Sequence, residues 1–251
     1  LLLKQKPKRQ GSRASQNDPD KKAPPPEVFD EVMRLADPEC PENPFSTLVR
    51  QRNYLLFRVL YETGMRAGEI LQLKVPDIHF SEQLISVVRR HDDPEDKWRS
   101  FEPNAKTQER DIPISYELSQ ALYNYIIDER RLLASTKKHG FLFVSNKGPS
   151  RGAPMSLSQF SKLVIKVSKD KNLASFIEGE GIQVDKHISR HGFRHNFNKR
   201  ISDTVDKHNF DAIRENRPHD VISEKAEADT RKYLLGHSSD KSAQVYNLRH
   251  T

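Results

Sequence analysis

Two arginines, two histidines and a late tyrosine occur along this chain in an order suited to phosphoryl transfer. They are Arg66, His191, Arg194, His237 and Tyr246. An arginine can bind a phosphate through two parallel hydrogen bonds, a histidine can move protons near neutral pH, and a tyrosine can become a covalent phosphotyrosine. The order therefore predicts attack of a phenol on a phosphodiester.

Arg66 lies within the motif Thr-Gly-Met-Arg-Ala-Gly-Glu, residues 63–69. Taken alone, an arginine after a helix end is a surface charge. Here Gly64 is expected to end the preceding helix in a left-handed conformation, which places the arginine on rigid backbone. Glu69, three residues later, can orient the guanidinium from behind. This context favours a functional arginine.

His191 and Arg194 are three residues apart, so on a helix they share one face and can converge on one small anion. Near the helix N-terminus, the helix dipole also favours a phosphate. An isolated His-x-x-Arg more often lies on a solvated helix face. The functional interpretation therefore depends on the surrounding motif, residues 189–197. His195 directly follows Arg194 and is expected to be structural.

The motifs around Arg66 and His191, together with Leu-Leu-Gly-His-Ser-Ser around His237, resemble the conserved sequence motifs of the tyrosine recombinase (phage integrase) family. The resemblance spans about residues 27–250. It implies that Arg66 and Arg194 clamp the scissile phosphate and that His191 accepts a proton. It also implies that His237 donates a hydrogen bond to a non-bridging phosphate oxygen.

The nucleophile implied by the resemblance is Tyr246, nine residues after His237. The chain has 7 tyrosines, and most tyrosines are half-buried packing residues. Only Tyr246 follows a Leu-Gly-His word at the interval that the family uses. Tyr233, just before that word, is the weaker candidate.

Lys106 is the implied general acid, because the family carries a lysine on a turn between two strands, ahead of an apolar-Pro-apolar strand. The run from Lys106 to Ile114 fits this pattern. A lysine with a lowered pKa can protonate the leaving 5′ oxygen. Lys97 lies nearby and remains the alternative.

The resemblance implies a site-specific DNA recombinase or integrase, as found on mobile genetic elements, that cleaves and rejoins strands through a 3′-phosphotyrosine. No cofactor is expected, since neither metal nor ATP is needed. The expected partners are double-stranded DNA and further copies of the chain in a tetramer on synapsed DNA, with no membrane and no small-molecule substrate. The alternatives are a type IB topoisomerase-like DNA-relaxing enzyme and a catalytically silent DNA-binding protein on the same fold.

Charge is unevenly distributed along the 251 residues. The net charge is +7, and residues 1–26 hold seven basic and two acidic side chains, so only +2 falls on the rest. This basic segment ends in three prolines and reads either as a flexible linker or as an arm that tracks phosphates. The single cysteine, Cys40, excludes a disulfide framework within one chain. A cytoplasmic location is expected, at the nucleoid if the source is bacterial.

The apolar periodicity predicts a mainly α protein with a small antiparallel β-sheet (α+β), similar to a tyrosine recombinase catalytic domain. Helices are expected at 27–36, 46–63, 115–134, 156–169, from Ser189 or His191 onward, at 230–235 and at 240–248, and strands at 84–90, 110–115 and 141–145. We expect residues 1–26 to be a linker and residues 27–251 to be the catalytic domain, with a charged insertion at about 203–228. That segment and the acidic stretch 91–100 are either surface loops or partner contacts. The family's N-terminal helical domain is expected to be missing ahead of Glu27.

Overall fold

The computed structural model describes residues 24–103, 107–184 and 188–236. Its helices are α1 (Pro26–Ala36), α2 (Arg50–Thr63), α3 (Ala67–Gln72), α4 (Tyr116–Asn124), α5 (Leu157–Ser168), α6 (Lys171–Gly179), α7 (Arg190–Arg214) and α8 (Glu224–Leu235). Its strands are β1 (Ile78–His79), β2 (Leu84–Val87) and β3 (Arg110–Pro113). The expected fold class, mainly helical with a small antiparallel sheet, is confirmed.

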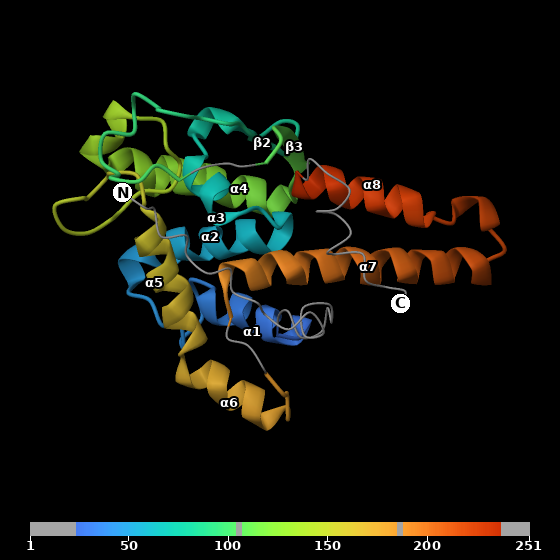
Figure 1. The fold of residues 1–251 in the computed structure, drawn as a ribbon. Helices are drawn as coiled ribbons and strands as arrows, with labels where there is room; N and C mark the ends of the chain where they lie inside the picture. The colour runs from blue at the N-terminus through green and yellow to red at the C-terminus, as the bar shows by residue number, and fades with distance from the viewer. Residues whose placement is uncertain (1–23, 104–106, 185–187, 237–251) are drawn as a thin grey trace, which may run out of the picture.

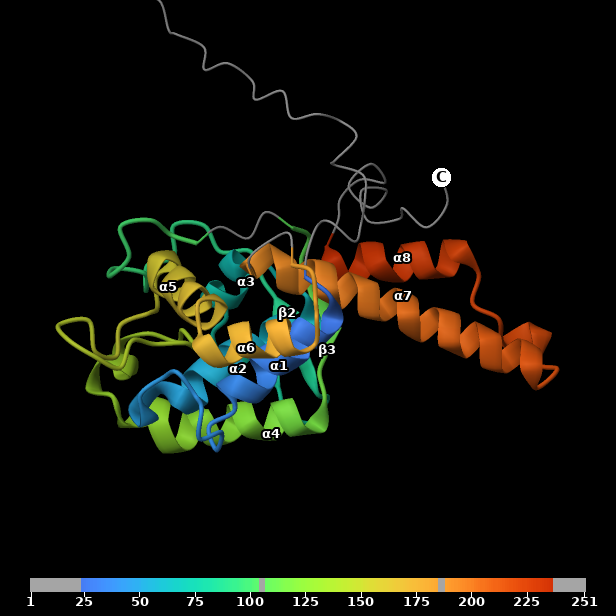
Figure 2. The ribbon, with the colours of Figure 1, turned by 90° about the horizontal axis from the view of Figure 1, so that it is seen from below.

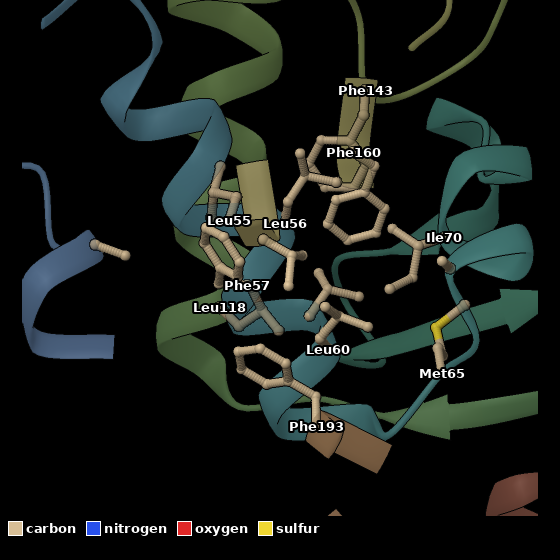
Figure 3. Close-up of a cluster of buried hydrophobic side chains, with 14 of the residues drawn as sticks. Leu55, Leu56, Phe57, Leu60, Met65, Ile70, Leu118, Phe143, Phe160 and Phe193 are labelled. Carbon is tan, nitrogen blue, oxygen red and sulfur yellow. The ribbon is translucent and has the colours of Figure 1, made fainter. Parts of the chain in front are cut away.

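Helix α2 forms the centre of the core. Its apolar residues Leu55, Leu56, Phe57, Val59 and Leu60 are all fully buried, so the helix is covered on most of its circumference. Figure 3 shows four of these side chains (the leucines and Phe57) clustered with residues from α4, α5 and the start of α7. Burial of such side chains is the main favourable term in folding. The core therefore fixes the end of α2, where the candidate arginine turn begins.

The small sheet is antiparallel, with strand order β1-β2-β3. In the pairing of β2 with β3, Ile85 lies opposite Ile112 and Val87 opposite Arg110. Alternate residues of β3 are buried, so Arg110 and Ile112 both point inward. A charged side chain on the apolar face of a strand needs a buried partner. That partner belongs to the candidate site.

The connection from β2 to β3 is held by its own charged residues where the structure describes it. Asp93 and Glu95 bind the ammonium of Lys74 at 2.8 and 3.0 Å. Asp96 pairs with Arg99 at 2.7 Å, and both side chains are almost completely buried. Asp93, Glu95 and Asp96 thus help to hold the connection in place.

Helices α7 and α8 lie side by side and project from the body of the molecule (Figures 1 and 2). Most of the charged segment 203–228 is helical, because α7 continues to Arg214 and α8 begins at Glu224. Polar contacts join α7 to the segment that leads into α8: Asn209 exchanges hydrogen bonds of 3.0 and 2.8 Å with the main chain of Ile222. The segment is thus a helical hairpin.

The expected helix end at Gly64 is confirmed: this glycine has φ of +60° and ends α2 in the left-handed region. Gly236, also with φ of +60°, ends α8 in the same way. Ser156 and Gln159 form a capping box at the start of α5.

Other expectations are wrong. Residues 141–145 make isolated bridges, Lys74 with Phe141 and Val144 with Pro154, instead of a strand. The helix expected at 115–134 ends as an α-helix at Asn124 and continues as a π-helical turn and short 3₁₀ turns. Helix α6 was not expected, because its apolar residues are few and follow directly on α5. Strand β1 is too short to show alternation.

Candidate active site

Arg66 lies at the turn between α2 and α3. It is the N-cap residue of α3, and its main-chain N–H donates to a carboxylate oxygen of Glu69 at 2.7 Å. Its Nη1 lies 3.9 Å from the other oxygen of Glu69, too far for a good hydrogen bond. Among the described residues, this Nη1 is buried and has no hydrogen-bond partner. The turn therefore holds a guanidinium with one buried donor that lacks a hydrogen-bond partner among the described residues.

The start of α7 packs directly onto this turn. Phe193 is fully buried and contacts the rings of Phe29 and Phe57, with centroids 5.0 and 5.8 Å away. Ser189 caps the helix by accepting a hydrogen bond from the N–H of Gly192 at 3.0 Å. Because the phenylalanine is locked inward, the orientation of the first helical turn, and with it His191, is fixed.

Arg194 is almost completely buried and joins three distant segments. Its Nη1 donates to the main-chain oxygen of Gly64 at 2.9 Å, and its Nη2 donates to that of Leu235 at 2.5 Å. Arg194 thus holds the end of α2, next to Arg66 in the chain, and the end of α8, next to His237 in the chain. These contacts are structural, so the role of Arg194 as a phosphate clamp stays a prediction.

The site is electropositive around His191. His191 is exposed, yet the pKa of its imidazole lies below the ordinary value because the surrounding protein partly desolvates it. The positive charges of Arg190, Arg66 and Arg194 lower the pKa further. A neutral imidazole can accept a proton at neutral pH. Desolvation also lowers the pKa of the half-buried Arg190. The group of cations suits a bound anion.

Glu69 is the carboxylate of this region, and it is engaged from the inner side. Its side chain is 0% exposed and receives two hydrogen bonds of 3.2 Å from Arg110 and one from the hydroxyl of Thr107. Burial alone would raise its pKa, but the charge and hydrogen bonds of Arg110 outweigh burial and hold the pKa of Glu69 below its usual range. Glu69 is therefore an ionised group whose side chain is paired with Arg110, and its predicted role of orienting the Arg66 guanidinium stays a prediction.

Three predicted site residues, Lys106, His237 and Tyr246, lie outside the described residues. Thr107, which follows Lys106, and Gly236, which precedes His237, lie within them. A Cβ added to Gly236 would be 2.9 Å from Cβ of Thr107, so the residue after Lys106 and the residue before His237 are in contact. The chemical roles of all three remain predictions.

The competing residues can be placed. Lys97 is exposed on the β2–β3 connection, and Tyr233 is 55% exposed on α8. Among the described residues there is no group of three or more histidine, cysteine, aspartate or glutamate side chains arranged to hold a metal. No described helix is both long and apolar enough to cross a membrane.

Sequence reasoning missed two arginines at this site, Arg110 and Arg190. A signal for Arg110 was present, because it shares the inward face of its strand with Ile112 and Ile114, where a charge calls for a buried partner. No comparable signal marks Arg190, whose position before His191 is informative only once the helix is placed.

The chain matches known proteins over most of its length. A model described as the phage integrase family matches residues 30–208. The tyrosine recombinase XerD of Halalkalibacterium halodurans is 26% identical over 170 residues, which are 68% of this chain and 46% of that protein. Transposase A from transposon Tn554 of Staphylococcus aureus is 26% identical over 141 residues, covering 56% of this chain and 34% of that protein. The chain spans about half the length of the XerD proteins it matches.

Solved structures share its fold. The Tn1549 transposon integrase in complex with circular intermediate DNA superposes with a TM-score of 0.60 at 18% identity, covering 92% of this chain and 62% of that one. The XerH site-specific recombinase bound to its difH substrate gives a TM-score of 0.56 at 20% identity, covering 89% and 49%. The architecture is that of a tyrosine recombinase catalytic domain.

Proposed function

The chain belongs to the phage integrase family, and we propose that it is a tyrosine-type site-specific DNA recombinase. It would cleave and rejoin DNA strands through a 3′-phosphotyrosine, without metal or ATP. The observation that carries the proposal is the unsatisfied Nη1 of Arg66 beside His191, whose pKa is lowered by desolvation and then by the positive charges around it. Such a site is built to bind an anion and to accept a proton there.

In the proposed reaction, the phenol oxygen of Tyr246 attacks the scissile phosphorus and the bond to the 5′ oxygen breaks. His191 takes the phenolic proton, and Lys106 gives a proton to the departing 5′ oxygen. Arg66, together with Arg194 and His237, stabilises the charge that develops on the non-bridging oxygens. Attack by a 5′-hydroxyl from a second duplex then releases the tyrosine and reseals the strand.

Double-stranded DNA is the proposed substrate, and a tetramer on two synapsed duplexes the proposed working assembly. The solved structures with this fold support the first point, since XerH is bound to difH and the Tn1549 integrase to circular intermediate DNA. We propose that this chain acts on DNA in the cytoplasm. Whether the whole reaction is integration, excision or resolution depends on the DNA sites it joins.

The test is to trap the covalent intermediate. The chain is incubated with nicked duplexes that carry junction sequences from beside its own gene, so that the short 5′ fragment diffuses away after cleavage. We expect a protein–DNA adduct on a denaturing gel that Tyr246→Phe abolishes and Tyr233→Phe retains. DNA binding without any adduct would contradict the proposal and favour a silent DNA-binding protein.

A second assay separates recombination from topoisomerase activity. The chain is given a supercoiled plasmid with paired sites and a matched plasmid without them. A recombinase yields joined or excised circles only from the paired sites. Relaxation of both plasmids with no recombinant product would instead indicate a DNA-relaxing enzyme.

A further inference from the structure

Arg110 binds two segments of the candidate site at once. Its side chain is 1% exposed, and its Nη1 and Nη2 donate to the two carboxylate oxygens of Glu69, each at 3.2 Å. Its Nε donates to the main-chain oxygen of Leu234 at 2.8 Å. One guanidinium therefore ties the carboxylate of the Arg66 turn to the last turn of α8.

The residue before His237 rests on this guanidinium. Gly236 has φ of +60°, and a Cβ added to it would lie 2.5 Å from Nη1 and 2.9 Å from Cζ of Arg110. The preceding oxygen, that of Leu235, accepts from Arg194. Residues 234–236 are thus held by two buried arginines, one from β3 and one from α7.

Arg110 also determines whether the Glu69 carboxylate is available to bind the Arg66 guanidinium. Both oxygens of the buried carboxylate already receive hydrogen bonds from Arg110, and the Arg66 guanidinium stands 3.9 Å away. Removing one partner of a buried ion pair leaves a charge that seeks another partner. Without Arg110, the nearest guanidinium that could move onto Glu69 is that of Arg66.

We propose that Arg110 is a positioning residue for the strand-cleavage reaction. By forming an ion pair with the Glu69 carboxylate, Arg110 leaves the Arg66 guanidinium available to the scissile phosphate. By holding residues 234–236, it sets where the chain leading into His237 begins. The inference rests on the proposed function. Arg110 acts through Arg66 and His237 and does not itself touch the phosphate.

The experiment compares single-turnover adduct formation by the 251-residue chain and by Arg110→Met on nicked duplexes, at saturating protein. We expect the rate to fall about 100-fold, the size of loss that a misplaced catalytic group produces. Arg90→Met is the matched control, since Arg90 makes the same kind of contacts, two hydrogen bonds to Asp77 and one to the oxygen of Gln72. Its folded fraction should react at the wild-type rate.

A substrate with a neutral methylphosphonate at the scissile position separates positioning from general damage. This substrate has no charge for Arg66 to clamp, so the loss caused by Arg110→Met should shrink at least about tenfold there. An equal loss on both substrates would overturn the proposal, because a merely structural defect does not depend on the charge of the phosphate.

Two further variants cover the case in which Arg110→Met does not fold. Arg110→Lys can pair with Glu69 but lacks the fork that also reaches Leu234, so an intermediate rate is expected. Glu69→Gln combined with Arg110→Met removes the buried charge, and should be more stable and faster than Arg110→Met alone. Wild-type rates in all of these variants would sink the inference while leaving the proposed function intact. No adduct from the wild-type chain itself would overturn both.

Discussion

Nη2 of Arg194 lies 2.5 Å from the main-chain oxygen of Leu235, a residue 41 positions later in the chain. The same guanidinium reaches back 130 positions to the oxygen of Gly64. A residue that resembles a phosphate clamp in the sequence is therefore also the physical link between the ends of α2 and α8. Loss of Arg194 should disturb both the structure and the reaction.

Arg194→Lys tests this link. A lysine presents one ammonium and cannot reach two carbonyl oxygens on different segments in the geometry of a guanidinium. We expect adduct formation to slow about 100-fold and the free energy of unfolding to fall by about 1–3 kcal/mol, the cost of leaving a buried acceptor unsatisfied. The measurements are single-turnover rates and urea unfolding.

Arg52→Lys is the matched control. Arg52 is buried and donates to the main-chain oxygen of Val144 at 2.9 Å, outside the candidate site. It should lose stability with little change in the rate of the folded protein. If Arg194→Lys behaved the same way, a direct contribution of Arg194 to the reaction would be excluded.

Gly64→Ala should be strongly destabilising, because the site lacks room as well as the right φ. A Cβ there would lie 2.8 Å from Cγ of Phe197, on α7. We expect a loss of at least about 3 kcal/mol, from a left-handed alanine and from overpacking together. Gly148→Ala is the control, since Gly148 has φ of +66° with nothing within 4 Å, and should lose only about 1–2 kcal/mol. Equal losses in urea unfolding would show that α7 does not press on the turn.

The rate of adduct formation should depend on pH through His191. A proton acceptor works only when neutral, and the pKa of His191 is lowered by desolvation and then by the charge of Arg190. The rate should therefore still be at its plateau when the pH reaches 6.5, the ordinary histidine pKa. It should decline only at lower pH, where His191 becomes protonated. Arg190→Gln removes a positive neighbour, which raises the pKa and moves the acidic limb of the pH–rate profile to higher pH.

Arg214→Gln is the control for charge alone. Arg214 is exposed near the end of the same helix, so its substitution should leave the acidic limb in place. An acidic limb that Arg190→Gln did not move would mean that another group accepts the proton.

The basic N-terminal segment should contribute salt-dependent DNA affinity. Four of its seven basic residues, Lys4, Lys6, Lys8 and Arg9, can be changed together to glutamine in the full chain. If the segment tracks phosphates, the slope of log affinity against log salt should become shallower by up to about 0.9 for each phosphate that is no longer neutralised. Fluorescence anisotropy with a duplex at several salt concentrations measures this slope. An unchanged slope would identify the segment as a linker only.

The sequence by itself determined much of the local structure. The apolar stripes of α1 and α2, the capping box at Ser156 and the glycine ends at Gly64 and Gly236 follow from short-range rules, because each depends on residues within about one helical turn. The words around Arg66 and His191 likewise predicted that these residues belong to one site. The π-helical turn after α4 and the bridges at 141–154 were not predictable in this way, since packing overrides local preference there.

Only the tertiary structure decided which groups are partners. Arg110 binds the oxygen of Leu234 across 124 positions, and Glu69 across 41, and no spacing rule connects residues so far apart. Whether a guanidinium is satisfied from within or left for a ligand depends on which carboxylates and carbonyls the packed core brings within hydrogen-bond distance of it. Arg110 and Arg66 are both arginines close to Glu69, and it is the burial of β3 beneath α8 that gives the carboxylate to Arg110 and leaves Arg66 with an unsatisfied donor.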